Sequence, residues 1–414
     1  MSLSSPLTKR LAIGAVVLAA AGGTGVVLMK KSAAPVTKKP STSVAHVAAA
    51  SASASSRPAS APNATILPPV PLDVTALTNK AGGKQSLKRR FPFVGGTDPR
   101  VAARINNQLF IETFEVLAPA HASDGLGEVT AETWQNRPEI DYKVQRNDGR
   151  IFSVVLATEG CGAYCESYNV SYAFDARSGR TLGAEDLLTP EGQAALTKEV
   201  KTANLAAIQA EITRLKTEKP KATGTKQQTD AEERAIALRM YEECALQRKA
   251  PDFINALQKM QIQPQTVVFS VERCSNHALS ALDHVGDFSF RVAVDKLTPW
   301  LNDYGHHLLL GKAANFAMPT SAWGQVLRGQ LDGKLPVTVR VGTPNADGSV
   351  SGVYFYDRFR KPLELSGTLK DHTLTLAETQ SKDKQPPRMV LIPQGAGLQG
   401  TWEGATKMEL TLEP

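Results

Sequence analysis

Catalytic signatures are what this 414-residue chain lacks most plainly. It has no G-x-S-x-G for a serine nucleophile, no H-E-x-x-H for a zinc protease and no G-x-x-x-x-G-K-[ST] phosphate loop. No G-x-G-x-x-G follows a predicted strand, so the dinucleotide-binding fingerprint is missing as well. The sequence therefore favours a protein without a resident cofactor and without catalysis of these kinds.

Acidic side chains are nearly absent from the first 90 residues, which hold 12 Lys and Arg but only one acid, Asp73. The whole chain has 47 basic and 40 acidic residues, so residues 91–414 hold 35 basic against 39 acidic ones. A body with a net charge of −4 lacks the basic footprint that binds a phosphate backbone. We therefore expect no nucleic-acid partner, despite the overall charge of +7.

A long uncharged run covers residues 11–29, between Lys9-Arg10 and Lys30-Lys31. At about 1.5 Å per residue it would span about 29 Å as a helix, close to the hydrocarbon thickness of a bilayer. Residues 1–31 are thus predicted to anchor the chain in the inner membrane by a single transmembrane helix, with the bulk of the chain in the periplasm. A cleaved signal peptide, cut near the small residues 19–22, is the alternative. Both interpretations export everything that follows.

Residues 32–90 are rich in Ala, Ser, Pro and Lys and include the stretch AAASASASSRPASAP. Such a composition offers too little apolar surface to offset the entropy lost on ordering. We predict a disordered tether that its prolines keep extended. It would hold a folded body at a distance from the membrane.

Cysteine is scarce: four residues permit three pairings. In an exported chain they should be oxidised. We favour Cys161–Cys165, which would close a tight turn, together with Cys244–Cys274, which would join a helix to a strand. Three residues separate Cys161 from Cys165, unlike the C-x-x-C of redox-active pairs, so both disulfides are expected to be structural.

Residues 91–305 alternate between helical and strand patterns. Asp98-Pro99 predicts a helix start, Asn147-Asp148-Gly149 a tight hairpin, and Thr189-Pro190 a second helix start. Helices are predicted over 101–117, 190–215 and 230–248, and strands over 139–146, 150–158, 168–174, 265–272 and 287–294. We expect an α+β domain, with helices packed on one side of an antiparallel sheet.

Residues 306–328 are predicted to be a connector, and residues 329–414 a small all-β module. In the latter range short alternating runs follow one another closely, with no helical pattern. The predicted strands are 334–341, 349–357, 363–368, 373–378, 389–393, 400–403 and 407–412. Seven short strands favour a small barrel or a curled sheet.

Four pieces of the first domain occur together in a known family. They are Ile105-Asn106 after Asp98-Pro99, the strand FSVVL, the stretch YAFDARSGRTL at 172–182 followed by EDLL at 185–188, and the strand and helix over 287–301. On these pieces residues 98–304 resemble an exported domain-of-unknown-function family. That family is shared by the sensor domains of RsiV-type anti-sigma factors and by the N-terminal part of PdaC-type peptidoglycan deacetylases.

The resemblance implies a binding domain rather than a catalytic one. In RsiV-type relatives this domain binds lysozyme, so a muramidase-like envelope protein is an implied partner, with peptidoglycan as the other. The deacetylase relatives keep their catalysis in a separate metal-binding domain, and this sequence contains no counterpart of it.

The β module is similar to a small module common in bacterial envelope proteins, through GVYFY at 352–356, LELSG at 363–367, LTLAE at 374–378 and GTW at 400–402. Its Tyr354, Tyr356 and Trp402 could line a ligand face, although aromatics that fill a barrel are the favoured interpretation. In the first domain Tyr164 and Glu166 are further candidates for a ligand surface.

Cys274, His277 and His284 form a C-x2-H-x6-H pattern and are the candidate metal site. Zinc accepts these ligand types, but a disulfide at Cys274 would remove the set. Loop histidines without a metal are therefore the favoured interpretation, and no resident metal is expected.

These observations favour a membrane-tethered, non-catalytic binding or sensor-type protein of the cell envelope. The alternative is a hydrolase that acts on cell-wall polymer through a groove containing Tyr164, Glu166 and Asp287. Two carboxylates farther apart than about 10 Å cannot share one glycosidic bond, so their geometry bears on this alternative.

Overall fold

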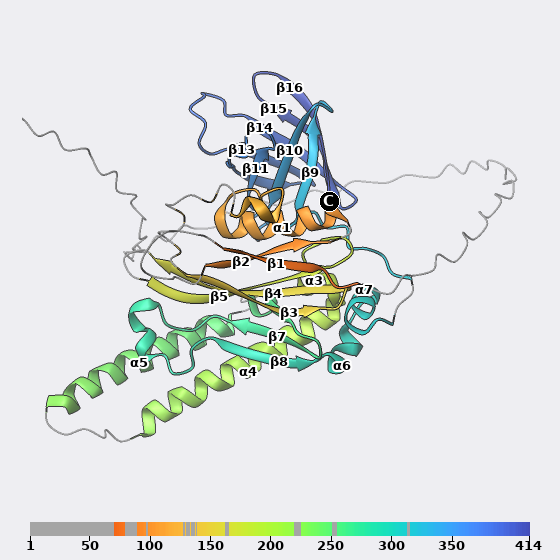
Figure 1. The fold of residues 1–414 in the computed structure, drawn as a ribbon. Helices are drawn as coiled ribbons and strands as arrows, with labels where there is room; N and C mark the ends of the chain where they lie inside the picture. Colours follow the sequence, from red (N-terminus) through yellow and green to blue (C-terminus); the bar gives the residue numbers. More distant parts are fainter. Residues whose placement is uncertain are drawn as a thin grey trace, which may run out of the picture. The chain divides into compact units, whose positions relative to one another are not determined.

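The structure is a computed structural model of the chain, drawn as a ribbon in Figure 1. It describes residues 70–78, 89–96, 98–126, 129, 133, 137, 139–161, 165–218, 225–250, 255–312 and 315–414. The predicted anchor 1–31, most of the predicted tether and Tyr164 lie outside these ranges. Within them, no helix combines the length and the apolar character that a membrane crossing requires.

Folded structure begins inside the range predicted as a tether. β1 (Asp73–Thr78) pairs antiparallel with β2 (Arg90–Gly95), and Leu77 lies opposite Phe91. Both of these side chains are buried. The tether prediction is wrong for these two strands, because pairing and packing against the rest of the chain supply a burial that local composition does not reveal.

α1 (Pro99–Phe114) starts where the sequence predicts. The Asp98 carboxylate accepts a hydrogen bond of 2.9 Å from a backbone N–H of the first turn, and Pro99 stands where no backbone donor is needed. The apolar face of the helix packs on β2, where the rings of Phe91 and Phe110 meet edge to face at 5.0 Å. This helix later forms one wall of the candidate site.

Two three-stranded antiparallel sheets follow. Their strands are β3 (Ile140–Asn147), β4 (Ile151–Cys161) and β5 (Cys165–Asp175) in the first, and β6 (Lys259–Ile262), β7 (Thr266–Val271) and β8 (Phe288–Ala293) in the second. The predicted hairpin is confirmed, since Asp148 Oδ1 accepts hydrogen bonds from the backbone of Arg150 and Ile151 at 3.1 and 2.9 Å. Four-residue β6 escaped prediction because it is too short to show alternation.

Two long helices, α4 (Pro190–Thr217) and α5 (Thr225–Lys249), pack along each other. Thr189 caps α4 as predicted, accepting a hydrogen bond from the backbone of Gly192 at 3.0 Å. The contact between the helices is apolar and includes Ile208, Ile212, Leu215, Met240 and Tyr241. With the sheets, these helices confirm the predicted α+β class.

Residues 326–413 form a closed barrel of eight antiparallel strands. The strands are β9 (Val326–Leu331), β10 (Leu335–Val341), β11 (Ser349–Tyr356), β12 (Leu363–Lys370), β13 (Thr373–Glu378), β14 (Arg388–Gln394), β15 (Gly397–Glu403) and β16 (Lys407–Glu413). β9 was not predicted, and it closes the barrel by pairing with both β10 and β16. Gly329 interrupts the strand pattern of β9, because glycine is uncommon inside strands. A Cβ there would lie 1.9 Å from the carbonyl oxygen of Thr411, so only glycine permits the close approach of β16.

Side chains fill the barrel, which therefore encloses a packed core. Its buried residues include Leu327, Val339, Tyr354, Leu376, Leu391 and Leu410.

The predicted connector is partly structured. Short helical segments precede and enter it: α6 (Val294–Leu297), α7 (Asp303–Gly305) and η5 (His306–Leu310). Leu308 and Leu309 are buried in the core of the α+β part, and β9 begins at Val326. The connector prediction is wrong at both of its ends, because apolar packing at one end and strand pairing at the other fix the chain.

Both favoured disulfides are present. Cys161–Cys165 closes the turn between β4 and β5, with 4.0 Å between the Cα atoms. Cys244–Cys274 joins α5 to the segment after β7, with a Cα separation of 5.6 Å. All four cysteines of the chain are thus paired.

Candidate functional site

The residues of the predicted metal pattern do not converge. Cys274 is bonded to Cys244 and offers no thiolate. The His277 ring lies 3.2 Å from a Glu166 oxygen, whereas the His284 ring contacts Glu211 at 3.1 Å. The candidate metal set is therefore not assembled, as expected if Cys274 forms a disulfide, and each of the three side chains has a different partner.

Glu166 occupies an ion-pair cluster beside both disulfides. Its carboxylate pairs with Arg273, the neighbour of Cys274, and with His277. The hydrogen bond from His277 and the charge of Arg273 hold the Glu166 pKa below its usual value. A general acid for glycoside hydrolysis needs a raised pKa, so this environment does not suit Glu166 to that role.

Asp287 shares the same cluster. Its Oδ1 accepts a hydrogen bond of 3.0 Å from the backbone of Arg273. Both carboxylates of the proposed hydrolase groove therefore act as acceptors that fix the segment after β7. This arrangement gives the hydrolase alternative no support.

The aromatic residues proposed for a ligand face belong to the barrel core. Tyr354 is fully buried and Trp402 nearly so, while Tyr356 packs at the edge of the same cluster. The Tyr354 hydroxyl donates to Glu378 Oε1 at 2.5 Å, and burial raises its pKa far above the usual value. The favoured interpretation, aromatics that fill the barrel, is confirmed for Tyr354 and Trp402, and the ligand face considered beside it is wrong for these two residues.

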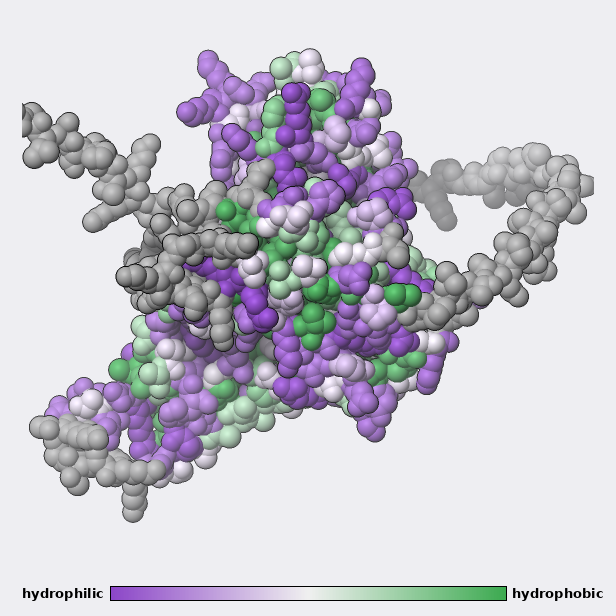
Figure 2. Space-filling model, viewed as in Figure 1, coloured by the Kyte–Doolittle hydropathy of each residue, from purple (hydrophilic) through white to green (hydrophobic). Residues whose placement is uncertain are grey.

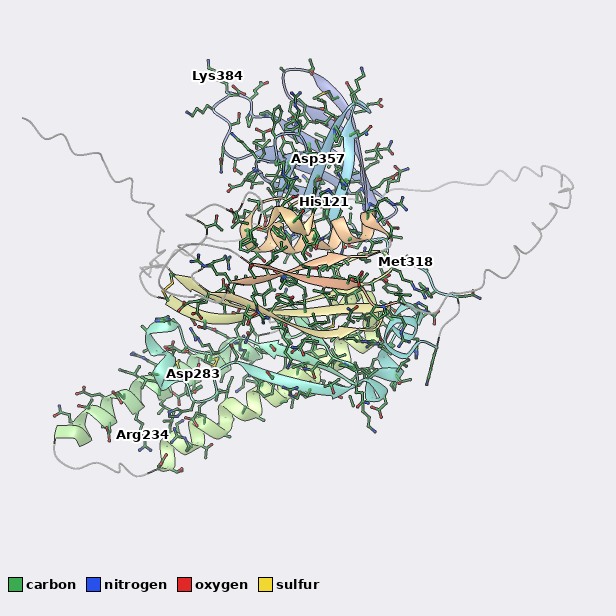
Figure 3. All side chains as sticks on the ribbon, viewed as in Figure 1. His121, Arg234, Asp283, Met318, Asp357 and Lys384 are labelled. Carbon is green, nitrogen blue, oxygen red and sulfur yellow. A yellow bond between two sulfur atoms is a disulfide. The ribbon has the colours of Figure 1, made fainter. Side chains whose placement is uncertain are left out.

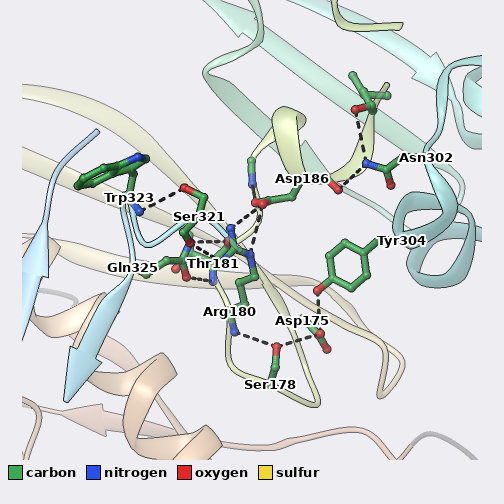
Figure 4. Close-up of polar contacts among 12 residues, drawn as sticks. Asp175, Ser178, Arg180, Thr181, Asp186, Asn302, Tyr304, Ser321, Trp323 and Gln325 are labelled. Atoms are coloured by element: carbon green, nitrogen blue, oxygen red, sulfur yellow. Dashed lines mark hydrogen bonds and ion pairs between the residues drawn. The ribbon is translucent and has the colours of Figure 1, made fainter. Parts of the chain in front are cut away.

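A buried ion pair lies where the family-like stretch 172–188 folds back on itself (Figure 4). Arg180 donates to Asp186 Oδ1 through Nη2 at 2.7 Å, and each side chain is only 4% exposed. Nearby, the Tyr304 hydroxyl donates to Asp175 Oδ2 at 2.8 Å. Sequence reasoning identified this stretch as family-like but did not identify the pair.

The same network reaches the chain that leads into the barrel. Arg180 donates to the Ser321 carbonyl at 2.8 Å, and the Gln325 amide exchanges two hydrogen bonds of 3.0 Å with the backbone of Thr181. Arg104 of α1 donates to the Gln325 side-chain oxygen at 3.1 Å, and burial lowers the Arg104 pKa to about 10. These bonds fix the start of β9 against the α+β part.

Apolar contact reinforces this junction. Ile111 of α1 and Leu117 just beyond it pack with Val326 and Phe355, which project from the outer face of β9 and β11. Beside this contact, between α1, the segment 117–122 and the barrel, lies a cavity of about 550 Å³. Ligand pockets commonly have volumes of about 300–1,000 Å³. Figure 2 shows apolar residues scattered over the middle of this face, and Figure 3 shows His121 beside α1 and Asp357 above it on the barrel.

One wall of this junction cavity is charged and comes from the barrel. Arg328 of β9 pairs with Asp357 Oδ2 at 2.8 Å, and the Thr338 hydroxyl donates to Asp357 Oδ1 at 2.7 Å. Arg360 donates to the carbonyls of Leu117 and Ala118 at 3.0 and 2.6 Å. Two arginines and one aspartate give this wall an excess of positive charge.

The opposite wall comes from α1 and carries two asparagines, whose side-chain amides differ in their hydrogen bonding. Asn106 exchanges two 2.8 Å hydrogen bonds with the backbone of Val94, which uses both ends of its amide. Asn107 Oδ1 accepts from the backbone of Ala118 at 3.0 Å, but among the described residues its Nδ2 finds no acceptor. Sequence reasoning missed this site, because its groups come from segments more than 200 residues apart.

No family model matches the chain, and none of the curated proteins matches it. Among solved structures, it is similar to a member of the DUF3298 family from Bacteroides fragilis, with 13% sequence identity, 56% of this chain and 91% of that chain covered, and a TM-score of 0.32. A DUF3298 family protein from Pseudomonas aeruginosa has 13% identity, 57% and 96% coverage, and a TM-score of 0.33. Both neighbours belong to a family of unknown function, so the likeness names no ligand.

Proposed function

We propose that this chain is a non-catalytic binding or sensor-type protein of the cell envelope. Residues 11–29 hold it in the inner membrane, and the folded part works in the periplasm on an envelope protein of the muramidase kind or on peptidoglycan. The proposal includes a relationship of residues 98–304 to RsiV-type and PdaC-type domains, which rests on the pieces quoted from the sequence.

The pairing of all four cysteines carries this proposal. Persistent disulfides are typical of oxidising compartments, and the apolar run near the N-terminus offers a route to one. The ionisable groups support a binding role, because Glu166, Asp287 and Asp186 are each engaged in contacts that hold the fold together.

Export and binding are tested with the full-length chain carrying a C-terminal epitope tag. In a Gram-negative host we expect the tag to sediment with the inner membrane and to become protease-sensitive once the outer membrane is opened. Mass spectrometry of the unreduced protein should then find both disulfides. A tag that stays protected until the inner membrane is lysed, with four alkylatable thiols, would refute the proposal.

Binding is measured by co-sedimentation with purified peptidoglycan and by capture from envelope extract, with lysozyme as a defined muramidase. A matched bait carries the anchor and tether, residues 1–69, without the folded part. Recovery by the full chain above this bait supports the proposal. Equal recovery by both baits contradicts it.

A further inference from the structure

We propose that the junction cavity between α1 and the barrel binds the terminal carboxylate of a short peptide with small apolar side chains. This inference deepens the proposed function and rests on it, because it assigns the ligand class to a particular site. Arg328 and Asn107 are the residues proposed to hold the carboxylate.

The unused amide of Asn107 is the first observation. The residue is only 8% exposed and lines the cavity, and its two Nδ2 hydrogens have no acceptor in the described part of the chain. A ligand oxygen in the cavity would take the place of water as the acceptor for this amide. Neighbouring Asn106 shows the contrast, because its amide is fully used by the backbone of Val94.

The second observation is the state of Arg328. Its Nη2 reaches Asp357, and no hydrogen bond is found for Nε or Nη1 within the described residues. Arginine presents several donors in a planar fork that matches a carboxylate. Arg328 and Asn107 both line the cavity and both have donors to spare, so the ligand should supply acceptors.

Asp357 offsets part of the positive charge of this wall. Its carboxylate already accepts from Arg328 and Thr338, at 2.8 and 2.7 Å. A ligand carboxylate would share Arg328 with it and would compete for the same charge. Asp357 therefore weakens binding of an anion, and this sets the sign of one test below.

The remaining lining selects a peptide over a sugar. Pro99, Ala102, Ala103, Ala118 and Ala120 give the cavity small apolar walls. Sugars are usually held against the faces of Tyr or Trp, and neither is among the described lining residues, whose aromatic rings are those of Phe93 and His121. These walls therefore favour small methyl-bearing side chains.

The test is isothermal titration of the full-length chain in detergent micelles with N-acetyl-alanyl-alanine and with its C-terminal amide. We expect the free acid to bind about 10- to 100-fold more tightly than the amide, the range for a hydrogen bond to a charged group. The L,L and D,D peptides are titrated separately, because the first represents the end of an ordinary protein and the second the end of a wall peptide.

Three variants locate the site. Arg328→Gln and Asn107→Asp should each weaken the acid about tenfold or more, since the first removes the charge and the second replaces donors with a repelling carboxylate. Asp357→Asn should tighten binding a few-fold. Arg388→Gln is the matched control, because Arg388 pairs with Glu403 at 2.8 Å on the barrel at the same exposure as Arg328 and should leave affinity unchanged.

Asn107→Asp keeps an oxygen for the Ala118 N–H, and melting temperature reports whether it folds. If it does not, Arg328→Gln, which alters a half-exposed side chain, decides the question. Equal binding of acid and amide, an unchanged Arg328→Gln affinity, or weaker binding by Asp357→Asn overturns the inference. If the variants still capture peptidoglycan or lysozyme, the proposed function holds and only this site is excluded.

Discussion

The α+β part and the barrel are stabilised in opposite ways. The α+β part has two disulfides, a buried ion pair and side-chain hydrogen bonds between distant segments. The barrel has no cysteine and relies on a closed ring of backbone hydrogen bonds around an apolar core. Stability should therefore depend on a few irreplaceable polar contacts in the first part and be spread over many replaceable ones in the second.

The largest expected effect comes from breaking the buried ion pair. Arg180→Met leaves Asp186 buried without its counter-charge and should lower the free energy of unfolding of the α+β part by about 3–5 kcal/mol. Arg388→Met, at the exposed pair with Glu403 on the barrel, should cost less than about 1 kcal/mol. Denaturation followed by hydrogen exchange resolves the two parts. Equal losses in both variants would contradict the comparison.

The disulfides come next. Cys244 and Cys274 close a loop of 30 residues, so replacing both with Ala should cost about 3–4 kcal/mol. Cys161 and Cys165 are four residues apart, and their double replacement should cost about 2 kcal/mol. Urea denaturation of each double variant measures the difference. If loss of the Cys161–Cys165 disulfide costs more than loss of Cys244–Cys274, the disulfide at the β4–β5 turn has a role beyond restricting the unfolded chain.

A smaller effect is expected from removing a polar contact inside the barrel. Tyr354→Phe removes the hydroxyl that donates to Glu378 and should cost about 1 kcal/mol, because the apolar ring still fills the core. Leu376→Ala, at another core position, is the contrasting variant and should cost about 2–5 kcal/mol through the cavity it leaves. Urea midpoints give both values, and a larger cost for Tyr354→Phe would show that the barrel too depends on a single polar contact.

The smallest effect is a response to acid that is larger in the α+β part than in the barrel. There the pKa values of Asp148, Glu166, Glu211, Glu272 and Asp283 are lowered, with ion pairs and hydrogen bonds to the carboxylates as the lowering causes. A carboxyl with a lowered folded pKa binds fewer protons in the native state, so its stabilisation is present above the unfolded pKa and is lost as pH falls. Burial raises the pKa of Glu185, which acts in the opposite direction.

The loss should therefore begin below about pH 4.5, the ordinary Glu value, and continue as the folded pKa values are passed. In the barrel only the exposed Asp347 and Glu403 have lowered carboxyl pKa values among the described residues. Thermal melts are recorded at several pH values between pH 6 and pH 3. The circular dichroism signal at 222 nm, which comes mainly from helices such as α4 and α5, reports unfolding of the α+β part. An equal fall in hydrogen-exchange protection of the barrel strands would refute this difference.

Local patterns predicted much of the fold. The capped starts at Asp98 and Thr189, the hairpin at Asp148 and both disulfides depend on neighbouring residues or on a small number of pairings, and all were predictable. β1 and β9 were missed, because their strand character depends on partners elsewhere in the chain.

The candidate site could not be predicted for the same reason. Asn107, Arg328 and Asp357 converge only after the barrel has packed on α1, and no local spacing connects them. The favoured role of Tyr354 and Trp402 as barrel-filling aromatics was predictable, but the ligand-face alternative had to stay open, because alternation does not show which side of a strand closes into a core.

Closure of the barrel by β9 and β16 also sets an order of events during synthesis. β9 emerges roughly 80 residues before the strand that completes it, a delay of several seconds at roughly 5–20 residues per second. Until then one edge of β9 is open to pairing with another chain. The nascent protein thus passes through a vulnerable interval, when a chaperone that shields strand edges would improve its yield more than one that shields apolar helices.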